Sequence, residues 1–437
     1  MIRFALSLAA FLALAGPSHA AVDIQEVTSP GGITAWLVEE DAVPFTALEI
    51  RFRGGASLDR EGKRGAINLM TATLEEGAGD LDAQAFAVAR DKLAASFRFD
   101  VSRDGLSVSA RFLTENRDEA IALLKLALTE PRFDEDAVAR VREQILSGIR
   151  SDLNDPNRIS GETFNGLAYG EHPYATNLDG TLESVATLTR DDVVNAYRDV
   201  MVKDRVYVGA TGDISADELS ALMDTLLGNL PTGGAPLPEQ VEVTMTGGIT
   251  VVPLDVPQSV ALFGHTGIPR DDPDFFAAFV ANEVFGGSGL QSRLSLEVRE
   301  ERGLTYGIGS YLVNWEHADM MIGQFATAND RVKEAIDVVM AEWEKVASDG
   351  VTQEELDAAQ TYLTGAYPLR FDSNASIARI LVGMQMDGLP IDYIETRNSK
   401  VEAVTVEDVK RVAERLYRRE DLRFVIVGQP EGLDSVN

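Results

Sequence analysis

The strongest constraint on the fold is an internal repeat that divides the chain into two similar halves. A shift of 216 positions (from 189 to 405) takes Thr189-Arg190-Asp191-Asp192-Val193 onto Thr405-Val406-Glu407-Asp408-Val409. The same shift takes Val27-Thr28 and Gly31-Gly32-Ile33-Thr34 onto Val243-Thr244 and Gly247-Gly248-Ile249-Thr250, and Thr211-Gly212 onto Val427-Gly428. Three matches in one register indicate a duplication, which predicts two copies of one fold.

Each half shows the same order of predicted elements. A Gly-Gly turn leads into two strands, helices with apolar residues at helical spacing follow, and a last strand closes the unit. Thr189 and Thr405 are predicted N-caps, because an acidic residue three positions on can reach back to the free amides. The predicted strands are 33–38, 46–52 and 206–210, then 249–254, 259–264 and 424–427, and the helical patterns include 119–128 and 334–346. We predict an α+β fold of two homologous α/β sandwich domains, each a mostly antiparallel sheet with helices on one side, arranged as a clam.

The chain also shows where it divides. Arg3 precedes an apolar run from Phe4 to Leu14 and the triplet Ser18-His19-Ala20, which is typical of a signal peptide at residues 1–20. A Pro/Gly-rich stretch predicts a linker at 231–242 between domains at 21–230 and 243–437. No later segment approaches the roughly 18 apolar residues that a membrane span needs. We expect export to the periplasm, with full secretion as the alternative.

Composition excludes several classes of function. The formal charge of −31 argues against nucleic acid as a partner, because phosphate neutralisation needs clustered Lys and Arg. There is no Cys, which excludes thiol catalysis and disulfides. An exported chain without disulfides depends on its hydrophobic core for stability, and this one is long enough for two domains.

Several motifs together resemble a known family. Gly54-Gly55-Ala56-Ser57-Leu58-Asp59, Gly65-Ala66-Ile67-Asn68-Leu69-Met70-Thr71-Ala72 and Glu76-Gly77 resemble the N-terminal signature of pitrilysin-type zinc metallopeptidases, the inverzincins. Glu171-His172-Pro173-Tyr174 resembles a later landmark of that family. The resemblance covers nearly the whole chain after residue 20, duplication included.

The resemblance also shows what the chain lacks. Active inverzincins carry H-x-x-E-H on a helix, where two His bind zinc and the Glu is the general base. Those places fall here on Asn68, Thr71 and Ala72, and the family's downstream Glu ligand falls at or near Gly148. None of these side chains is a strong zinc ligand or a base at neutral pH, so we expect a degenerate zinc site and no cofactor in this chain.

The histidines lead to the same expectation. After residue 20 only His172, His265 and His317 occur, and no two are close enough in sequence to form a metal-binding pair. We therefore interpret each His as a structural or surface residue. A cryptic metal site built from distant His residues is the less favoured alternative.

The second half retains one constellation of interest. A glycine loop at 286–289 precedes a charged segment with Arg299, Gly303 and Tyr306, and Leu304 to Leu312 is predicted to be a strand. The resemblance implies that Arg299 and Tyr306 bind the substrate backbone and stabilise the oxyanion. From spacing alone, a solvated charged helix face and a core aromatic are the more common outcome.

Taken together, the resemblance implies half of an enzyme. We expect a non-catalytic, substrate-binding subunit of a heterodimeric zinc metallopeptidase that degrades peptides, with zinc in a homologous H-x-x-E-H partner. The alternative is a catalytically inert peptide-binding or assembly scaffold.

Overall fold

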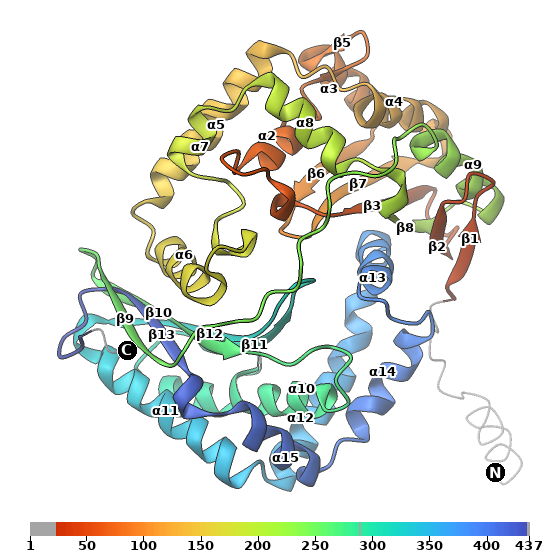
Figure 1. Ribbon diagram of the computed structural model, residues 1–437. Helices are drawn as coiled ribbons and strands as arrows, with labels where there is room; N and C mark the ends of the chain where they lie inside the picture. Colours follow the sequence, from red (N-terminus) through yellow and green to blue (C-terminus); the bar gives the residue numbers. More distant parts are fainter. Residues whose placement is uncertain (1–22, 288, 290, 435–437) are drawn as a thin grey trace, which may run out of the picture.

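The computed structural model describes residues 23–287, 289 and 291–434. The predicted signal peptide lies outside these residues. Among the described helices, none combines the length and apolar character that crossing a membrane requires. Two lobes, each built on one large sheet, make up the molecule (Figure 1).

The two sheets repeat one strand order. The first runs β1-β2-β8-β3-β7-β6 and the second β9-β13-β10-β12-β11 when read from the matching edge. In each sheet one pair is parallel, β2 with β8 and β13 with β9, and the other pairs are antiparallel. The strands are β1 Gln25–Thr28, β2 Thr34–Glu39, β3 Phe45–Arg53, β6 Ser96–Val101, β7 Gly105–Leu113, β8 Val206–Gly212, β9 Gly248–Pro253, β10 Gln258–Thr266, β11 Ile308–Asn314, β12 Asp319–Ala328 and β13 Arg423–Gly428. The α+β prediction with mostly antiparallel sheets is therefore confirmed.

Helices fill the connections in a matching order. In the first half they are α2 Ala66–Ala72, α3 Ala83–Lys92, α4 Arg117–Thr129, α5 Glu135–Asp152, α6 Pro156–Tyr169, α7 Leu182–Ala186, α8 Arg190–Val200 and α9 Ala216–Leu227. In the second half they are α10 Phe275–Gly286, α11 Val332–Asp349, α12 Gln353–Ala366, α13 Asn374–Met386, α14 Tyr393–Glu402 and α15 Val406–Leu416. A short hairpin, β4 Gly77–Ala78 and β5 Leu81–Asp82, precedes α3. Residues 231–247 carry no helix or strand, while the domain boundaries themselves stay predictions.

Both predicted N-caps are present. Thr189 forms a reciprocal capping box with Asp192 at the start of α8, and Thr405 does so with Asp408 at the start of α15. Each box satisfies two backbone amides that the helix itself leaves without acceptors. The repeat in the sequence thus specifies the same helix start in both halves.

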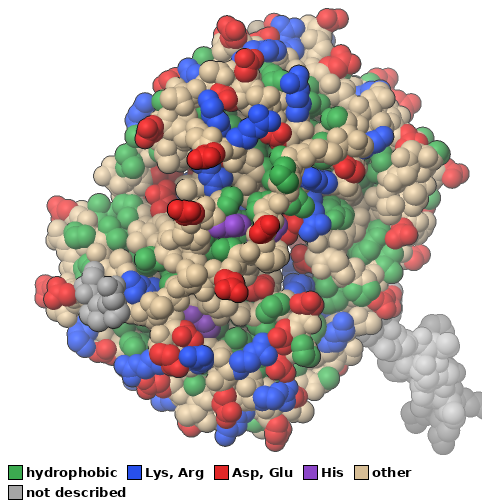
Figure 2. Space-filling view, in the orientation of Figure 1, with side chains coloured by type: hydrophobic (Ala, Val, Ile, Leu, Met, Phe, Trp, Pro, Cys, Tyr) green, Lys and Arg blue, Asp and Glu red, His purple; other side chains and the backbone are tan. Residues whose placement is uncertain are grey.

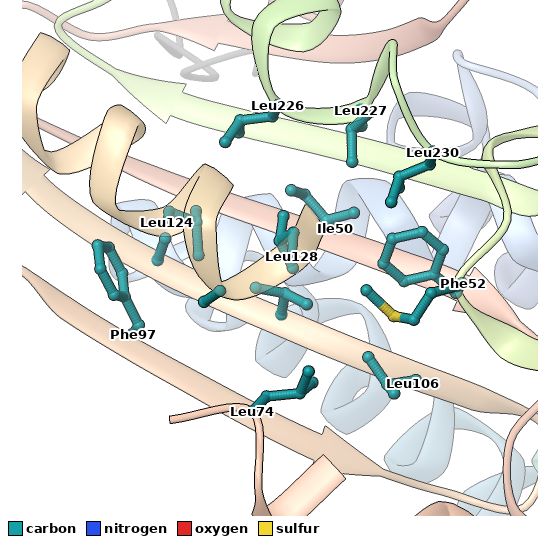
Figure 3. Packing of buried hydrophobic residues seen from close by; sticks show 14 of the residues in the cluster. Ile50, Phe52, Leu74, Phe97, Leu106, Leu124, Leu128, Leu226, Leu227 and Leu230 are labelled. Carbon is teal, nitrogen blue, oxygen red and sulfur yellow. The ribbon is translucent and has the colours of Figure 1, made fainter. Parts of the chain in front are cut away.

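One helix of each half crosses to the sheet of the other half (Figure 1). Helix α13 packs on the first sheet, where Trp36 joins a cluster with Leu381 and Met384. The neighbouring strand residues Ala35 and Leu37 point to the opposite face, into the core beneath α2, α4 and α9, because side chains alternate along a strand. Some of this core is shown in Figure 3, where Ile50 and Phe52 of β3, Leu106 of β7, Leu124 and Leu128 of α4, and Leu226 and Leu227 of α9 are labelled.

The second sheet receives α6 in the same way. Phe164 and Ala168 of α6 pack with Val425 of β13, and Leu262 of β10 borders this cluster. Small residues permit both approaches: a Cβ at Gly209 would lie 2.6 Å from the Ala378 carbonyl oxygen of α13, and one at Gly264 would lie 3.1 Å from Phe164 Cζ. Each sheet therefore has helices on both faces, and the expectation of helices on one side was incomplete because it treated each half alone.

We predict that Phe164→Ala destabilises the chain by about 3–5 kcal/mol, because it empties a fully buried site between α6 and the second sheet. The free energy of unfolding from urea titration measures this effect. Leu153→Ala, at a leucine that is 56% exposed, is the control and should change stability by about 0.5 kcal/mol or less. Equal losses in the two variants would contradict the interface described here.

Candidate functional site

Helix α2 carries the positions where the sequence predicts a degenerate zinc site. Its start is held by Asp59, whose carboxylate accepts hydrogen bonds from the backbone amides of Gly65 at 2.7 Å and Ile67 at 2.9 Å. Burial raises the pKa of Asp59 to about 6. Gly65 adopts a φ of 89° and lies so close to Asp179 that a Cβ would be 2.6 Å from its carbonyl oxygen. The first turn of α2 is therefore fixed against the loop that carries Asp179.

The three key side chains of α2 are committed elsewhere or are chemically inert. Asn68 Nδ2 donates to Asp179 Oδ1 at 3.0 Å, and the buried Thr71 hydroxyl donates to the Ile67 carbonyl oxygen of its own helix at 2.8 Å. Ala72 is exposed and presents only a methyl group. An amide, a committed hydroxyl and a methyl group offer neither the nitrogen ligands nor the base that a zinc hydrolase requires.

A salt-bridged network surrounds Asn68. Arg158 Nη2 lies 2.8 Å from Asp179 Oδ2, and Arg158 Nε lies 2.9 Å from Asp152 Oδ2. The guanidinium of Arg158 thus pairs with two carboxylates, one of which is the hydrogen-bond acceptor of Asn68. The side chains of Asn68, Asp179 and Arg158 therefore all have polar partners within the chain and need no bound ion to satisfy them.

Gly148, the position expected for the downstream ligand, lies on the exposed face of α5. No atom lies within 4 Å of where its Cβ would be built, so the local packing leaves room for a side chain. Position 148 offers no metal ligand because glycine has no side chain, and not because neighbouring atoms would exclude one. Across the described ranges 23–287, 289 and 291–434, no group of three His, Cys, Asp or Glu residues is arranged to hold a metal.

Two of the three histidines meet in space although they are far apart in sequence. The rings of His172 and His317 have centroids 6.2 Å apart. His172 Nδ1 accepts from the Tyr174 backbone amide at 3.2 Å, and its Nε2 lies 3.3 Å from the Glu239 carbonyl oxygen. The approach of His172 to His317 was not expected from the sequence, and the ring nitrogens of His172 are used in local contacts.

The same region ties the two halves together through Tyr174. Its hydroxyl donates to Asp104 Oδ1 at 2.6 Å and accepts from the His317 backbone amide at 3.1 Å. Arg53 pairs with Glu316 at 2.5 Å across the same junction. The family landmark around His172 and Tyr174 therefore has a structural role here, in the contact between the halves.

The predicted donor pair lies on the second half, away from α2. Arg299 lies on the π-helix η5, Ser295–Glu300, and Tyr306 lies in the segment that follows. That segment is not the predicted strand, because β11 begins only at Ile308. It is anchored by Leu304, whose amide donates to Val298 and whose carbonyl accepts from Thr327. Anchoring on both sides holds the position of the residues around Tyr306.

Arg299 and Tyr306 line one open pocket of about 460 Å³. The other lining residues also belong to the second half, among them Gln258, Thr305 and Arg331. Tyr306 is 91% exposed, and Arg299 contacts Glu300 at 3.4 Å. The two predicted donors therefore line the same pocket. The α2 positions Asn68, Thr71 and Ala72 are not among the residues that line it.

Comparison with known proteins places this geometry in a family. Residues 187–363 match the family described as the peptidase M16 inactive domain. A solved peptidase M16 inactive domain from Pseudomonas fluorescens superposes with a TM-score of 0.88 at 27% identity, over 95% of this chain and 100% of that one. The chain is therefore similar to M16 peptidase proteins in sequence over residues 187–363 and in fold over 95% of its length. The resemblance to pitrilysin-type metallopeptidases is thereby confirmed.

The M16 relatives differ in what their names state. A non-peptidase homolog, YmxG, of Helicobacter pylori is 27% identical over 390 residues, which is 89% of this chain and 90% of that protein. An uncharacterized zinc protease of Mycobacterium leprae is 26% identical over 398 residues, 90% of this chain and 89% of that one. A protease structure from Helicobacter pylori, at 17% identity and a TM-score of 0.84, covers 93% of this chain and 99% of its own and shares the fold. In this chain the α2 positions carry Asn68, Thr71 and Ala72, none of which is a strong zinc ligand or a general base.

Sequence reasoning missed the junction around Tyr174 and the meeting of His172 with His317. Asp104 gave no signal because it lies in an ordinary hairpin turn between β6 and β7. The pairing of Tyr174 with the second half depends on how the halves dock, which no local pattern encodes. Correlated substitutions between distant positions are the kind of signal that reveals such contacts.

We predict an acid-dependent loss of stability from His265. It is buried against Trp343, and burial lowers its pKa from 6.5 to about 4. Between pH 6.5 and 4 the unfolded chain takes up a proton at this imidazole and the folded chain does not, so stability falls as pH falls. The shift corresponds to roughly 3 kcal/mol over that window.

Urea titrations at a series of pH values measure this contribution. In His265→Phe the loss between pH 6.5 and 4 should be smaller than in the wild type by about that amount, because Phe does not titrate. Parallel pH profiles for the two proteins would show that His265 is not held neutral by burial.

Proposed function

We propose that this chain is the non-catalytic, substrate-binding subunit of a heterodimeric zinc metallopeptidase. In this proposal a homologous H-x-x-E-H subunit carries the zinc and the general base, and the pair degrades peptides in the periplasm. Arg299 and Tyr306 reach into the partner's active site from this chain. The single observation that carries the proposal is the division just described: two hydrogen-bond donors remain accessible while the metal-binding positions are replaced.

The accessible donors support a role outside the chain. Tyr306 Oη makes no hydrogen bond within the described residues, and the ion pair of Arg299 is a long one to the adjacent Glu300. A tyrosine that contributed to stability would bury its ring, as Tyr174 and Tyr417 do. The exposed ring of Tyr306 has no packing role that explains its position.

The chemistry of peptide hydrolysis gives such donors a purpose. Attack of water on the peptide carbonyl produces a tetrahedral oxyanion, and donors already in position stabilise it as the charge develops. A guanidinium and a phenol supply hydrogen bonds for this without being consumed. Zinc in the partner subunit would activate the attacking water. In this chain Arg299 and Tyr306 hold the substrate backbone and the developing charge.

A second function has support from a different observation. The pocket at Arg299 and Tyr306 is open to solvent, and the Helicobacter pylori relative is named a non-peptidase homolog. These features favour a catalytically inert peptide-binding or assembly scaffold. In that case the two side chains contribute to binding and not to turnover.

We predict that the purified chain alone does not hydrolyse a fluorogenic peptide and that its complex with an H-x-x-E-H homologue does. In the complex, Tyr306→Phe should lower kcat about 100- to 1,000-fold, since removal of one oxyanion donor has an effect of that size. Arg299→Ala should lower kcat and also raise KM, because it removes a contact to the substrate backbone.

Tyr311→Phe on the neighbouring β11 is the matched control, at a tyrosine that is also exposed, and it should leave both constants unchanged. The zinc content of the complex should be the same in all variants. Normal turnover by a complex that carries both Arg299→Ala and Tyr306→Phe would favour the scaffold function.

A further inference from the structure

A second pocket lies within the second half, remote in the chain from Arg299 and Tyr306. It has a volume of about 580 Å³ and lies between α10, α13, α14 and the 3-10 turn η7, Tyr367–Phe371. Pockets of this size hold small organic molecules. The function proposed above gives this pocket no role.

Aromatic rings and cations line this pocket together. The rings are those of Phe275, Phe276, Phe279, Tyr367 and Tyr393, and the guanidinium groups are those of Arg270, Arg370, Arg379 and Arg397. The only carboxylates among the lining residues are those of Asp372 and Asp387. The pocket lining therefore carries an excess of positive charge, although the whole chain has a net charge of −31. Elsewhere on the face shown in Figure 2, Lys and Arg are mixed with Asp and Glu.

Arg397 is the unusual member of the set. It is 7% exposed, and its guanidinium lies over the Tyr367 ring at 4.5 Å and the Phe279 ring at 5.5 Å. Its Nη1 donates to the Leu363 carbonyl oxygen at 2.7 Å and to Asn398 Oδ1 at 2.9 Å. It forms no ion pair with any carboxylate in the part of the chain that the structure describes. Buried cations are normally paired, so a buried guanidinium without a counter-charge calls for a ligand.

The neighbouring guanidinium groups also lack enough negative charge to balance them. Burial lowers the pKa of Arg397, and the positive charges of Arg370 and Arg270 lower it further. Arg270 has a buried Nε without a hydrogen-bond partner, and its ion pair with Asp387 is long, at 3.7 Å. Arg370 is exposed and has no ion pair within the described residues. An anion bound among these three groups would supply the missing negative charge.

We propose that this pocket binds a carboxylate carried on an aliphatic or aromatic body. The carboxylate lies among Arg270, Arg370 and Arg397, and the body lies against the rings of Phe276 and Tyr393. Guanidinium groups pair with carboxylates through two parallel hydrogen bonds, and the rings provide the apolar surface. Asp372 and Asp387 leave the lining with two positive units of charge. The rings favour an anion with an apolar body over inorganic phosphate, which has none. A fatty acid and the C-terminal end of a peptide both have this chemistry.

Calorimetric titration of the mature chain tests the proposal with defined probes. Decanoate represents the fatty acid and acetyl-Gly-Phe the peptide end. We expect at least one of them to saturate a single site per chain, and which one binds identifies the source. Acetyl-Gly-Phe amide, acetate and inorganic phosphate should each bind at least about tenfold more weakly, since each lacks the single negative charge or the apolar body.

Two variants locate the site. Arg397→Gln and Arg370→Gln should each weaken the binding about tenfold, whereas Arg98→Gln, at an exposed arginine on β6 that pairs with Asp100, should not change it. If Arg397→Gln does not fold, Arg370→Gln decides alone, because Arg370 is exposed and unpaired within the described residues. Failure of both carboxylates to saturate, phosphate binding as tight as theirs, or equal weakening in Arg98→Gln would overturn the proposal. None of these results depends on peptidase activity, so the function proposed above is tested separately.

Discussion

The exchange of helices between the two halves is the contact on which the rest of the structure depends. Helix α6 packs on the second sheet and α13 packs on the first, and Gly209 and Gly264 leave the space for these approaches. Neither sheet has a complete apolar cover without the other half. The junction of Tyr174 with Asp104 and His317 adds hydrogen bonds to the same contact. The halves are therefore held in one arrangement, with α2 on the first and the pair of Arg299 and Tyr306 on the second.

Within this frame the chain has the fold of a solved M16 protein, and its α2 carries no zinc ligand or base at Asn68, Thr71 and Ala72. The carboxylate of Asp59 fixes the start of this helix by accepting hydrogen bonds from the amides of Gly65 and Ile67. Asn68 donates a hydrogen bond to Asp179, which also pairs with Arg158. The side chains around Asn68 therefore have hydrogen-bond and ion-pair partners within the chain. The donors on the second half have no such internal partners.

Much of the fold was predictable because its signals are local. The turn at Gly31-Gly32 and the caps at Thr189 and Thr405 depend on a few neighbouring residues and appear in the structure. The prediction of a turn at Gly247-Gly248 was wrong, because Gly248 already begins β9 and both amides donate to the segment at 420–422. The crossing of α6 and α13 was not predictable, since it depends on the opposite faces of two sheets. The absence of ligands at Asn68, Thr71 and Ala72 could be read directly, whereas the meeting of His172 with His317 required the docked halves. Arg299 and Tyr306 could be selected only through the family resemblance, because spacing alone does not distinguish an active donor from a surface residue.

The zinc content of the purified single chain tests the central claim most directly. After equilibration with zinc and removal of the excess, elemental analysis should find far less than one tightly bound zinc ion per chain. One zinc ion per chain that is lost in a variant with His172→Ala and His317→Ala would contradict the account, because the chain would then hold a metal centre of its own.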